Sequence, residues 1–243
     1  MSRFSKQSDL YAEYRPDYPD ELYNFILEHL SNYHRAWDCA TGSGQVAAVL
    51  SESFDEVIAT DISTEQLNHA PAIQNVDYRK APAENSGLPD EHVDLITVGQ
   101  ALHWFDFEAF YNEVRRLAKR NALFAVFGYG MLRISPAINP IIDDLYEEAF
   151  GAYFDEKRSY IDSRYQTIPF PFEEIMSPGF EHSLAWTIDQ LEGYFNSWSA
   201  VQKLKDEQNY NPVDATMQKL QKQLSNHETI TVTFPIFLRL GKL

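Results

Sequence analysis

Two glycines and one aspartate early in the chain have the spacing of a nucleotide-binding site. Gly42 and Gly44 stand in a short loop after the apolar segment 36–39, and Asp61 follows a second apolar segment, 56–60. Glycine allows backbone torsions and a close approach to a ligand that a Cβ would prevent. An acid at the end of the second strand can accept hydrogen bonds from both hydroxyls of a ribose. The spacing therefore favours an adenosine-containing ligand over an ordinary glycine turn.

The loop alone leaves two classes of ligand open. Residues 42–47 match the G-x-G-x-x-A pattern of dinucleotide sites. Asp38, just ahead of the loop, would repel a pyrophosphate, whereas its carboxylate suits the ammonium and sulfonium groups of S-adenosylmethionine. Asp38 could also cap backbone amides of its own loop. The residues therefore favour S-adenosylmethionine and keep a nicotinamide dinucleotide as the alternative.

An alternation of strands and helices must position these residues. Ser63 and Gln66 form a capping-box pattern at the start of one helix, and Asp106 has the position of a cap for another. Several of the strands are near-continuous apolar runs, which is typical of a buried parallel sheet. The predicted strands are 36–39, 56–60, 76–80, 93–98 and 122–127; the predicted helices are 20–30 and those that begin near Val46, at Ser63 and at Asp106, the last ending at Lys119.

The pattern predicts the α/β class, with a Rossmann-like fold and a mostly parallel central sheet that carries helices on both faces. Ligands of such sheets bind beyond the carboxyl ends of the strands, where the strand order reverses. The last third of the chain predicts helices over 135–150 and 188–204 and a long strand over 228–240. We expect one domain, residues 1–243, with a cofactor-binding core at about 32–130 and a helical lid made by about 131–180 and the N-terminal segment.

Composition excludes several classes of protein. The net charge of −16, without a basic cluster, disfavours nucleic acid as a partner. No apolar run is long enough to span a bilayer, and no apolar stretch follows the first basic residues as in a secretory signal. The single cysteine, Cys39, fits a reducing compartment, so we expect a cytoplasmic protein without membrane contact. The seven histidines include no pair at ligand spacing, so no metal site is predicted.

Several ordered segments carry a resemblance to a known family. The segments 37–45, 81–95 and 100–106, together with Asp61, resemble the class I S-adenosylmethionine-dependent methyltransferases. The nearest branch is the type 11 small-molecule group that includes trans-aconitate methyltransferase-like proteins. Segments 11–16 and 197–201 also resemble that branch. The resemblance implies S-adenosyl-L-methionine as the cofactor and a small molecule as the methyl acceptor.

The resemblance also implies roles for individual residues. Asp38 and the backbone of the glycine loop would hold the methionine moiety, Asp61 the ribose, and Ile62 the adenine ring. Arg15 could pair with the cofactor carboxylate through its donor fork. Gln100 and His103 would flank the sulfonium region. The full predicted cofactor set is Arg15, Asp38, Ala40, Thr41, Gly42, Ser43, Gly44, Asp61, Ile62, Ala83, Glu84, Gln100 and His103.

The chain departs from the family pattern at two places. Ala40 stands where the family usually has its first glycine, which is tolerable if the residue keeps a negative φ. Residues 119–121 read Lys-Arg-Asn in place of the usual Pro-Gly-Gly turn before the fifth strand, a change that we expect to affect only a surface loop.

Methyl transfer from a sulfonium leaves open whether the protein must supply a base. The donor is already activated, so the protein mainly aligns donor and acceptor. A carboxylate acceptor needs no base, whereas a hydroxyl or amine would need one, and His103 is the candidate. The alternative for His103 is a structural histidine beside Trp104. Arg133, Arg158 and Arg164 could bind substrate carboxylates, although exposed arginines are more often solvated.

Three hypotheses about function follow from these residues. The leading one is a methyltransferase that acts on an oxygen atom of a small molecule, with carboxylic acids among its acceptors. The absence of an Asn-Pro-Pro-Tyr segment after the fourth strand disfavours base methylation. The alternatives are a nicotinamide-dependent oxidoreductase that uses the same loop and a non-catalytic S-adenosylmethionine-binding protein. The sequence leaves the identity of the acceptor and the oligomeric state open.

Overall fold

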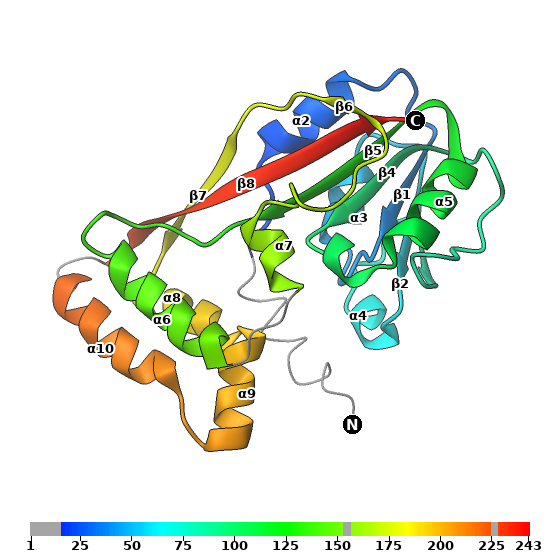
Figure 1. Cartoon of the computed structure of the whole chain (residues 1–243). Coiled ribbons are helices and arrows are strands. Elements are labelled where there is room, and N and C mark those ends of the chain that lie inside the picture. The colour runs from blue at the N-terminus through cyan, green and yellow to red at the C-terminus, as the bar shows by residue number, and fades with distance from the viewer. Residues whose placement is uncertain (1–15, 153–156, 225–227) are drawn as a thin grey trace. The chain divides into compact units, whose positions relative to one another are not determined.

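A computed structural model describes residues 16–152, 157–224 and 228–243. Eight strands form one sheet in the order β3-β2-β1-β4-β5-β8-β6, with β7 paired to β8. The strands are β1 (Arg35–Cys39), β2 (Glu56–Asp61), β3 (Val76–Lys80), β4 (Val93–Gly99), β5 (Ala118–Tyr129), β6 (Glu173–Ile175), β7 (Phe180–Trp186) and β8 (Ile230–Lys242). Figure 1 shows β8 as a single long strand, coloured red.

The first five strands are parallel, as their apolar runs predict. β1 pairs with both β2 and β4, so the strand order reverses at β1, directly before the glycine loop. β8 is antiparallel to β5 and to β6. The α/β Rossmann-like fold with a mostly parallel sheet is therefore confirmed.

Helices connect the strands and cover both faces of the parallel sheet. On one face, Trp37 of β1 and Phe124 of β5 belong to an apolar cluster with Phe110 and Val114 of α5. On the other face, Phe127 of β5 lies 6.3 Å from Tyr23 of α2, measured between ring centroids. The helices are α2 (Asp20–Glu28), α3 (Gln45–Leu50), α4 (Thr64–Asn68), α5 (Phe107–Leu117), α6 (Asn139–Ala152), α7 (Arg158–Asp162), α8 (Ile188–Asn196), α9 (Ser199–Gln208) and α10 (Pro212–Leu224), and a 3₁₀ turn, η1, spans Leu102–Trp104.

Two helix starts agree with their predicted caps. The Ser63 hydroxyl accepts a hydrogen bond from the Gln66 amide, and Asp106 accepts one from the Ala109 amide. The predicted end of the second of these helices at Lys119 is wrong, because β5 begins at Ala118 and the helix ends at Leu117.

Residues 119–121 were expected in a surface loop, and that expectation is also wrong. They lie inside β5, where the pairing with β4 shifts register between Val93 and Leu95. Here β5 has more residues than the facing part of β4, and Asn121 accommodates them with a left-handed φ of 66°. Asparagine tolerates this conformation better than most residues.

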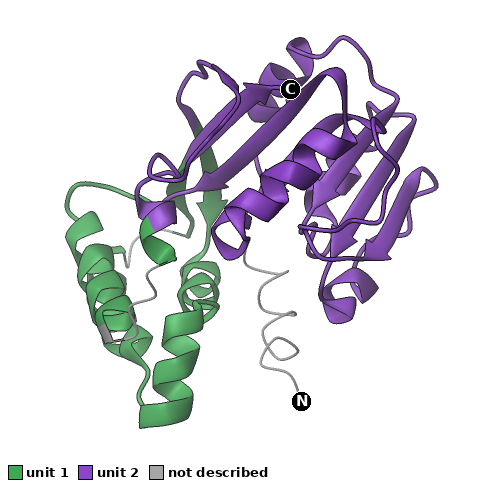
Figure 2. Cartoon of the chain, turned by 45° about the vertical axis from the view of Figure 1, so that its right-hand side comes forward, with its two compact units in different colours: residues 1–16, 131–159, 181–235 green, residues 17–130, 160–180, 236–243 purple. Residues whose placement is uncertain are grey.

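The chain forms two compact units (Figure 2). The first, residues 1–16, 131–159 and 181–235, is largely helical in its described part; the second, residues 17–130, 160–180 and 236–243, holds the five parallel strands. Residues 131–180 are thus divided between the units, and the helical lid stays a prediction. None of the described helices is long and apolar enough to cross a membrane.

In the first unit, one helix prediction needed correction and one helix was missed. The predicted helix over 188–204 ends at Asn196 and restarts at Ser199, because Trp198 has an extended ψ of 130° and caps the second helix. α10 was not predicted at all. Its buried residues Val213, Met217 and Leu220 follow a helical spacing that sequence reading overlooked.

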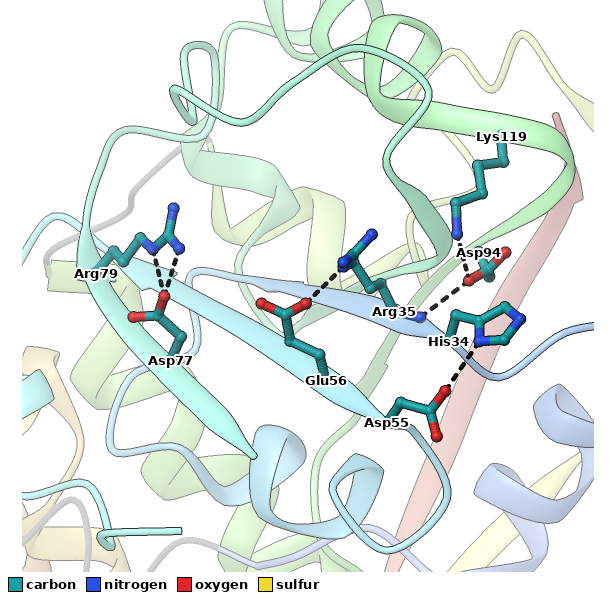
Figure 3. A network of polar contacts seen from close by, with 8 residues as sticks. All are labelled: His34, Arg35, Asp55, Glu56, Asp77, Arg79, Asp94 and Lys119. Atoms are coloured by element: carbon teal, nitrogen blue, oxygen red, sulfur yellow. Dashed lines mark hydrogen bonds and ion pairs between the residues drawn. The ribbon is translucent and has the colours of Figure 1, made fainter. Parts of the chain in front are cut away.

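At the amino ends of the strands, polar side chains fix the strands against one another (Figure 3). Asp94 of β4 is 5% exposed and accepts hydrogen bonds from the Arg35 amide and the Lys119 ammonium, each at 2.9 Å. It therefore joins β4 to both of its neighbours, β1 and β5. Asp77 and Arg79, both in β3, form an ion pair that is nearly half exposed.

Asp94 is buried and Asp77 is nearly half exposed, so removing their carboxylates should change the free energy of unfolding by different amounts. Asp94→Ala leaves a partly buried amide and ammonium without their acceptor, so the free energy of unfolding should fall by about 1–3 kcal/mol. Asp77→Ala removes an exposed pair and should change it by less than about 1 kcal/mol. Urea unfolding of both variants measures the difference, and equal effects would contradict the role assigned to Asp94.

Candidate functional site

The glycine loop begins directly after β1 and has an unusual backbone. Gly42 and Gly44 have φ values of 59° and 81°, and Ala40 has a φ of 56°. The expectation that Ala40 keeps a negative φ is wrong. The left-handed conformation costs a residue with a Cβ about 1–2 kcal/mol, which explains why glycine suits this position.

The two glycines serve different purposes. A Cβ on Gly42 would meet no atom within 4 Å, so the loop backbone is open to a ligand at this residue. A Cβ on Gly44 would lie 2.6 Å from the hydroxyl oxygen of Tyr78 in β3. Gly44 therefore allows the loop to pack closely against Tyr78, whereas Gly42 leaves space for a ligand beside the loop backbone. Beside this loop the Tyr78 hydroxyl is buried and has no hydrogen-bond partner among the residues that the structure describes.

Asp61 ties the end of β2 to the glycine loop. One carboxylate oxygen accepts a hydrogen bond from the Gly42 amide at 3.0 Å, and the other accepts one from the Ser63 amide at 2.7 Å. Each carboxylate oxygen has a further lone pair. The carboxylate is half-buried, so it can still accept hydrogen bonds from a diol.

Asp38 is buried rather than open to a ligand. It is 1% exposed, and its carboxylate accepts hydrogen bonds from Thr41 at 2.6 Å and from Thr97 of β4 at 2.8 Å. Burial raises the pKa of Asp38 from 3.8 to about 6, although the hydrogen bonds from the two threonines act in the opposite direction. The acid therefore holds the loop to the sheet.

Ile62 and two further residues of the predicted cofactor set, Ala83 and Glu84, lie on two neighbouring segments. Ile62, directly after Asp61, is 69% exposed, which is unusual for a large apolar side chain and fits a residue that packs on a ring. Ala83 is buried. The Glu84 carboxylate accepts a hydrogen bond from the Asp106 amide at 3.0 Å and so joins the segment after β3 to the start of α5.

Gln100 follows β4 and is held by the neighbouring strand. Its φ is 55°, and its side-chain amide both accepts a hydrogen bond from the Tyr129 amide at 2.9 Å and donates one to the Tyr129 carbonyl. A Cβ on Gly128 would lie only 2.2 Å from the Gln100 side-chain oxygen. This amide therefore extends the ladder of β5 and fixes the turn that leads to His103.

His103 lies in η1 and is 5% exposed. Its Nδ1 atom is 2.8 Å from the hydroxyl oxygen of Tyr165, and its ring centroid is 4.7 Å from that of Trp104. The contact with Trp104 agrees with the structural alternative for this histidine. The hydrogen bond to Tyr165 was not anticipated.

The structure brings most of the predicted cofactor residues to the carboxyl edge of the sheet. The loop residues Thr41 and Ser43 follow β1, Asp61 ends β2 with Ile62 directly after it, and Gln100 follows β4. Arg15 lies outside the described residues. Sequence reading missed Thr97 and Tyr78, and only the strand register reveals them, since it places Thr97 beside Asp38 and Tyr78 beside Ala59, the other neighbour of Asp38.

The arginines considered for substrate binding have other contacts or lie exposed. Arg133 forms an ion pair with Asp143 at 2.6 Å. Arg158 lies over the rings of Tyr146 and Phe150, and Arg164 is exposed. No group of three or more metal-ligating side chains occurs among the residues that the structure describes.

The raised pKa of Asp38 predicts a pH-dependent stability. Because the folded state keeps the proton from pH 3.8 up to about 6 while the unfolded state loses it, stability is lost as the pH rises through that window. Relative to Asp38→Asn, the wild type should lose on the order of 2–3 kcal/mol of unfolding free energy between pH 4 and pH 7.5. Urea unfolding at both pH values measures the loss. A difference that does not change with pH would contradict it.

The conformation of Ala40 predicts an unusual response to glycine. Ala40→Gly removes the left-handed strain and should raise the free energy of unfolding by about 0.5 kcal/mol, after the extra entropy of the unfolded chain is counted. Ala48→Gly, in the middle of α3, has no strain to relieve and should lower it by about 1 kcal/mol. A loss of similar size in both variants would show that Ala40 is not strained.

Comparison with known proteins agrees with this geometry. A family model described as "Methyltransferase domain" matches residues 37–126. A "putative methyltransferase" of Dictyostelium discoideum is 33% identical over 99% of this chain and 94% of its own length. A "putative type II methyltransferase" from Anaeromyxobacter dehalogenans has a solved structure that is 35% identical, with a TM-score of 0.87 over 94% of this chain and 97% of its own.

The name of a more distant relative includes a cofactor. A "probable S-adenosylmethionine-dependent methyltransferase" of Saccharomyces cerevisiae is 28% identical over 61% of this chain and 51% of its own length. Together with the sheet order and the loop, these findings decide against the nicotinamide-dependent oxidoreductase. The chain belongs to the class I S-adenosylmethionine-dependent methyltransferases.

Proposed function

We propose that this protein binds S-adenosylmethionine at the carboxyl edge of β1 and β2 and transfers its methyl group to an oxygen atom of a small molecule, with a carboxylate as the favoured acceptor. The observation that best supports this cofactor site is the hydrogen bond from the Gly42 amide to the Asp61 carboxylate. The open backbone of the loop and the carboxylate that can accept a ribose are joined by one hydrogen bond of 3.0 Å.

The residues present fit this cofactor. Gly42 leaves the loop open, Asp61 keeps free lone pairs, and Ile62 exposes an apolar side chain beside it. Asp38 is too deeply buried to be a direct ligand of the ammonium, but its negative charge lies below the loop and favours a cation there. When bound, the cofactor supplies an activated methyl group on a sulfonium.

The protein's own contribution is alignment. Asp38 holds Thr41 and Thr97, while Asp61 and Gln100 fix the ends of β2 and β4, so the cofactor site is built before a ligand arrives. Holding donor and acceptor in attack geometry can lower a barrier by about 7–11 kcal/mol.

The choice of a carboxylate acceptor follows from the chemistry of methylation. A carboxylate attacks without losing a proton, so no general base is required. His103 is the candidate base, yet it is buried and its Nδ1 atom is engaged by Tyr165. The net charge of −16 and the lack of a basic cluster support a small acceptor rather than a nucleic acid.

Ligand-induced thermal stabilisation tests the cofactor. At about 100 times its Kd, S-adenosylmethionine or S-adenosylhomocysteine should stabilise the protein by roughly 2.7 kcal/mol, which corresponds to about 5–10 °C. NAD and NADP should have no effect. A shift with the dinucleotides alone would overturn the proposal, and a screen of carboxylic acids for methyl transfer then tests the acceptor.

Two valine variants make this test specific to the loop. Gly42→Val should abolish the shift with S-adenosylhomocysteine, because the new side chain fills the open approach to the loop. Gly87→Val is the matched control, since Gly87 also has a left-handed φ, 72°, and open space at its Cβ position. Gly87→Val should suffer the same backbone strain and keep the ligand shift. Equal loss of the shift in both variants would contradict the assignment of the loop.

A further inference from the structure

The hydroxyl group of Tyr78 does not contribute to stability in the usual way. Tyr78 belongs to β3 at the edge of the sheet, and its side chain is half-buried. The hydroxyl oxygen itself is closed to solvent and has no hydrogen-bond partner among the described residues. A buried hydroxyl without a partner lowers stability, because its hydrogen bonds to water are lost and not replaced. Phenylalanine would fill the same place without this loss, so the contribution of the hydroxyl must lie elsewhere.

The register of the sheet directs the Tyr78 ring toward the glycine loop. Tyr78 pairs with Ala59 of β2, and Ala59 pairs with Asp38 of β1. Paired residues of neighbouring strands point to the same face of a sheet, so these three side chains form one row. The middle residue has only a methyl group, which leaves room for the ring to extend toward β1. The pKa of Tyr78 is raised, first by burial and then by the negative charge of Asp38, which agrees with this direction.

The end of the ring lies against Gly44. A Cβ on Gly44 would be 2.6 Å from the Tyr78 hydroxyl oxygen, 2.9 Å from Cε1 and 3.1 Å from Cζ. The hydroxyl oxygen is therefore the atom nearest to that position, and it fills the space that a side chain of residue 44 would need. The hydroxyl thus makes a steric contact with the loop while it makes no hydrogen bond among the described residues.

Gly44 connects the loop to the helix that follows. Its amide donates a hydrogen bond to the Thr41 carbonyl at 3.0 Å, and its carbonyl accepts one from the Ala48 amide at 2.8 Å. The Thr41 hydroxyl in turn donates to Asp38. A displacement of Gly44 would therefore move the first turn of α3 and the preceding residues of the loop, including Gly42. The contact with Tyr78 lies where it can set the height of the whole loop above the sheet.

We propose that Tyr78 is a positioning residue of the cofactor site, and that its hydroxyl acts as a spacer between the sheet and Gly44 and not as a hydrogen-bond donor. The spacer keeps the loop where the Gly42 backbone is open and its amide reaches Asp61. Without the oxygen, the loop would settle toward the sheet. The inference rests on the proposed function, since it names a residue that sets the affinity of the loop for the adenosyl ligand.

Backbone NMR tests the spacer without any ligand. The chain has ten glycines, so ¹⁵N-glycine labelling gives few signals, and those of Gly42 and Gly44 are assigned by their loss in the two alanine variants. Tyr78→Phe removes one oxygen atom, so both signals should shift and the Gly44 amide should exchange its hydrogen faster. Gly87 also has a left-handed φ but no atom within 4 Å of its Cβ position, and its signal should stay unchanged. Unchanged signals of Gly42 and Gly44 would overturn the proposal.

A pair of phenylalanine variants separates positioning from stability. The Tyr111 hydroxyl donates to the Pro169 carbonyl at 2.7 Å, so Tyr111→Phe should lower the urea midpoint and leave the affinity for S-adenosylhomocysteine unchanged. Tyr78→Phe should leave the midpoint unchanged or raise it. It should bind S-adenosylhomocysteine about tenfold more weakly, because a small displacement of a site can cost this much. Unchanged affinity in Tyr78→Phe, or a midpoint lowered as far as in Tyr111→Phe, would overturn the proposal.

A fluorine atom distinguishes a spacer from a donor. Replacement of Tyr78 by 4-fluorophenylalanine puts an atom of nearly the size of oxygen at the end of the ring, but this atom has no hydrogen to donate. The fluorinated protein should therefore recover most of the affinity for S-adenosylhomocysteine that Tyr78→Phe loses. An affinity as low as that of Tyr78→Phe would show that the hydroxyl acts as a donor, and the spacer would be wrong.

The outcomes distinguish this inference from the proposed function. The glycine signals are measured without ligand, so the choice of cofactor does not affect them. If the signals shift in Tyr78→Phe while neither adenosyl compound binds the wild type, the spacer stands and the proposed function fails. If the adenosyl compounds bind while Tyr78→Phe changes neither the glycine signals nor the affinity, the cofactor site stands and the role of Tyr78 fails.

Discussion

The candidate site depends on one buried carboxylate. Asp38 sits in the central strand of the parallel sheet, and its hydrogen bonds to Thr41 and Thr97 join the glycine loop to the neighbouring strand. Its hydrogen-bond donors, the two threonine hydroxyls and the Ala47 amide, are all neutral, so burial dominates and the pKa of Asp38 rises to about 6. Such a group is costly to keep inside a protein. A buried carboxylate at this position would attract a cation bound at the loop, because the attraction between opposite charges is strongest where water is excluded.

Left-handed residues stand directly after two of the parallel strands. Ala40 follows β1 and Gln100 follows β4, with φ values of 56° and 55°. Both strands are thus followed directly by a left-handed residue, and neither of these two residues is a glycine. At Gln100 the side chain compensates by bonding to the Tyr129 backbone, and the lack of a side chain on Gly128 makes room for it. Ala40 has no comparable compensation from its methyl group, so the strain there remains in the loop.

The sequence predicted the parallel core well because its signals are local. Apolar runs, the Ser63 and Asp106 caps and the spacing from Gly44 to Asp61 all arise within short stretches of chain. The glycine loop and Asp61 were therefore placed correctly. The long-range contacts could not be predicted. Nothing near His103 in sequence indicates that Tyr165 bonds to it, and nothing near Asp38 indicates Thr97. The φ of Ala40 was predicted with the wrong sign, because alanine in a strand-to-helix turn normally avoids that conformation.

The position of β8 in the sheet has a consequence for how the protein folds during synthesis. β1 to β5 lie within residues 35–129 and can pair as they emerge, whereas among the described strands β6 and β7 pair with β8 alone. β6 pairs with residues 240–242, so at 5–20 residues per second it must wait roughly 3–13 s until that end of β8 has been made. During that interval β5 is an open edge of a hydrophobic sheet, which is the arrangement that invites pairing with another chain. Nascent molecules should thus be most vulnerable to aggregation after the parallel core has formed, and a chaperone that covers a sheet edge would protect them.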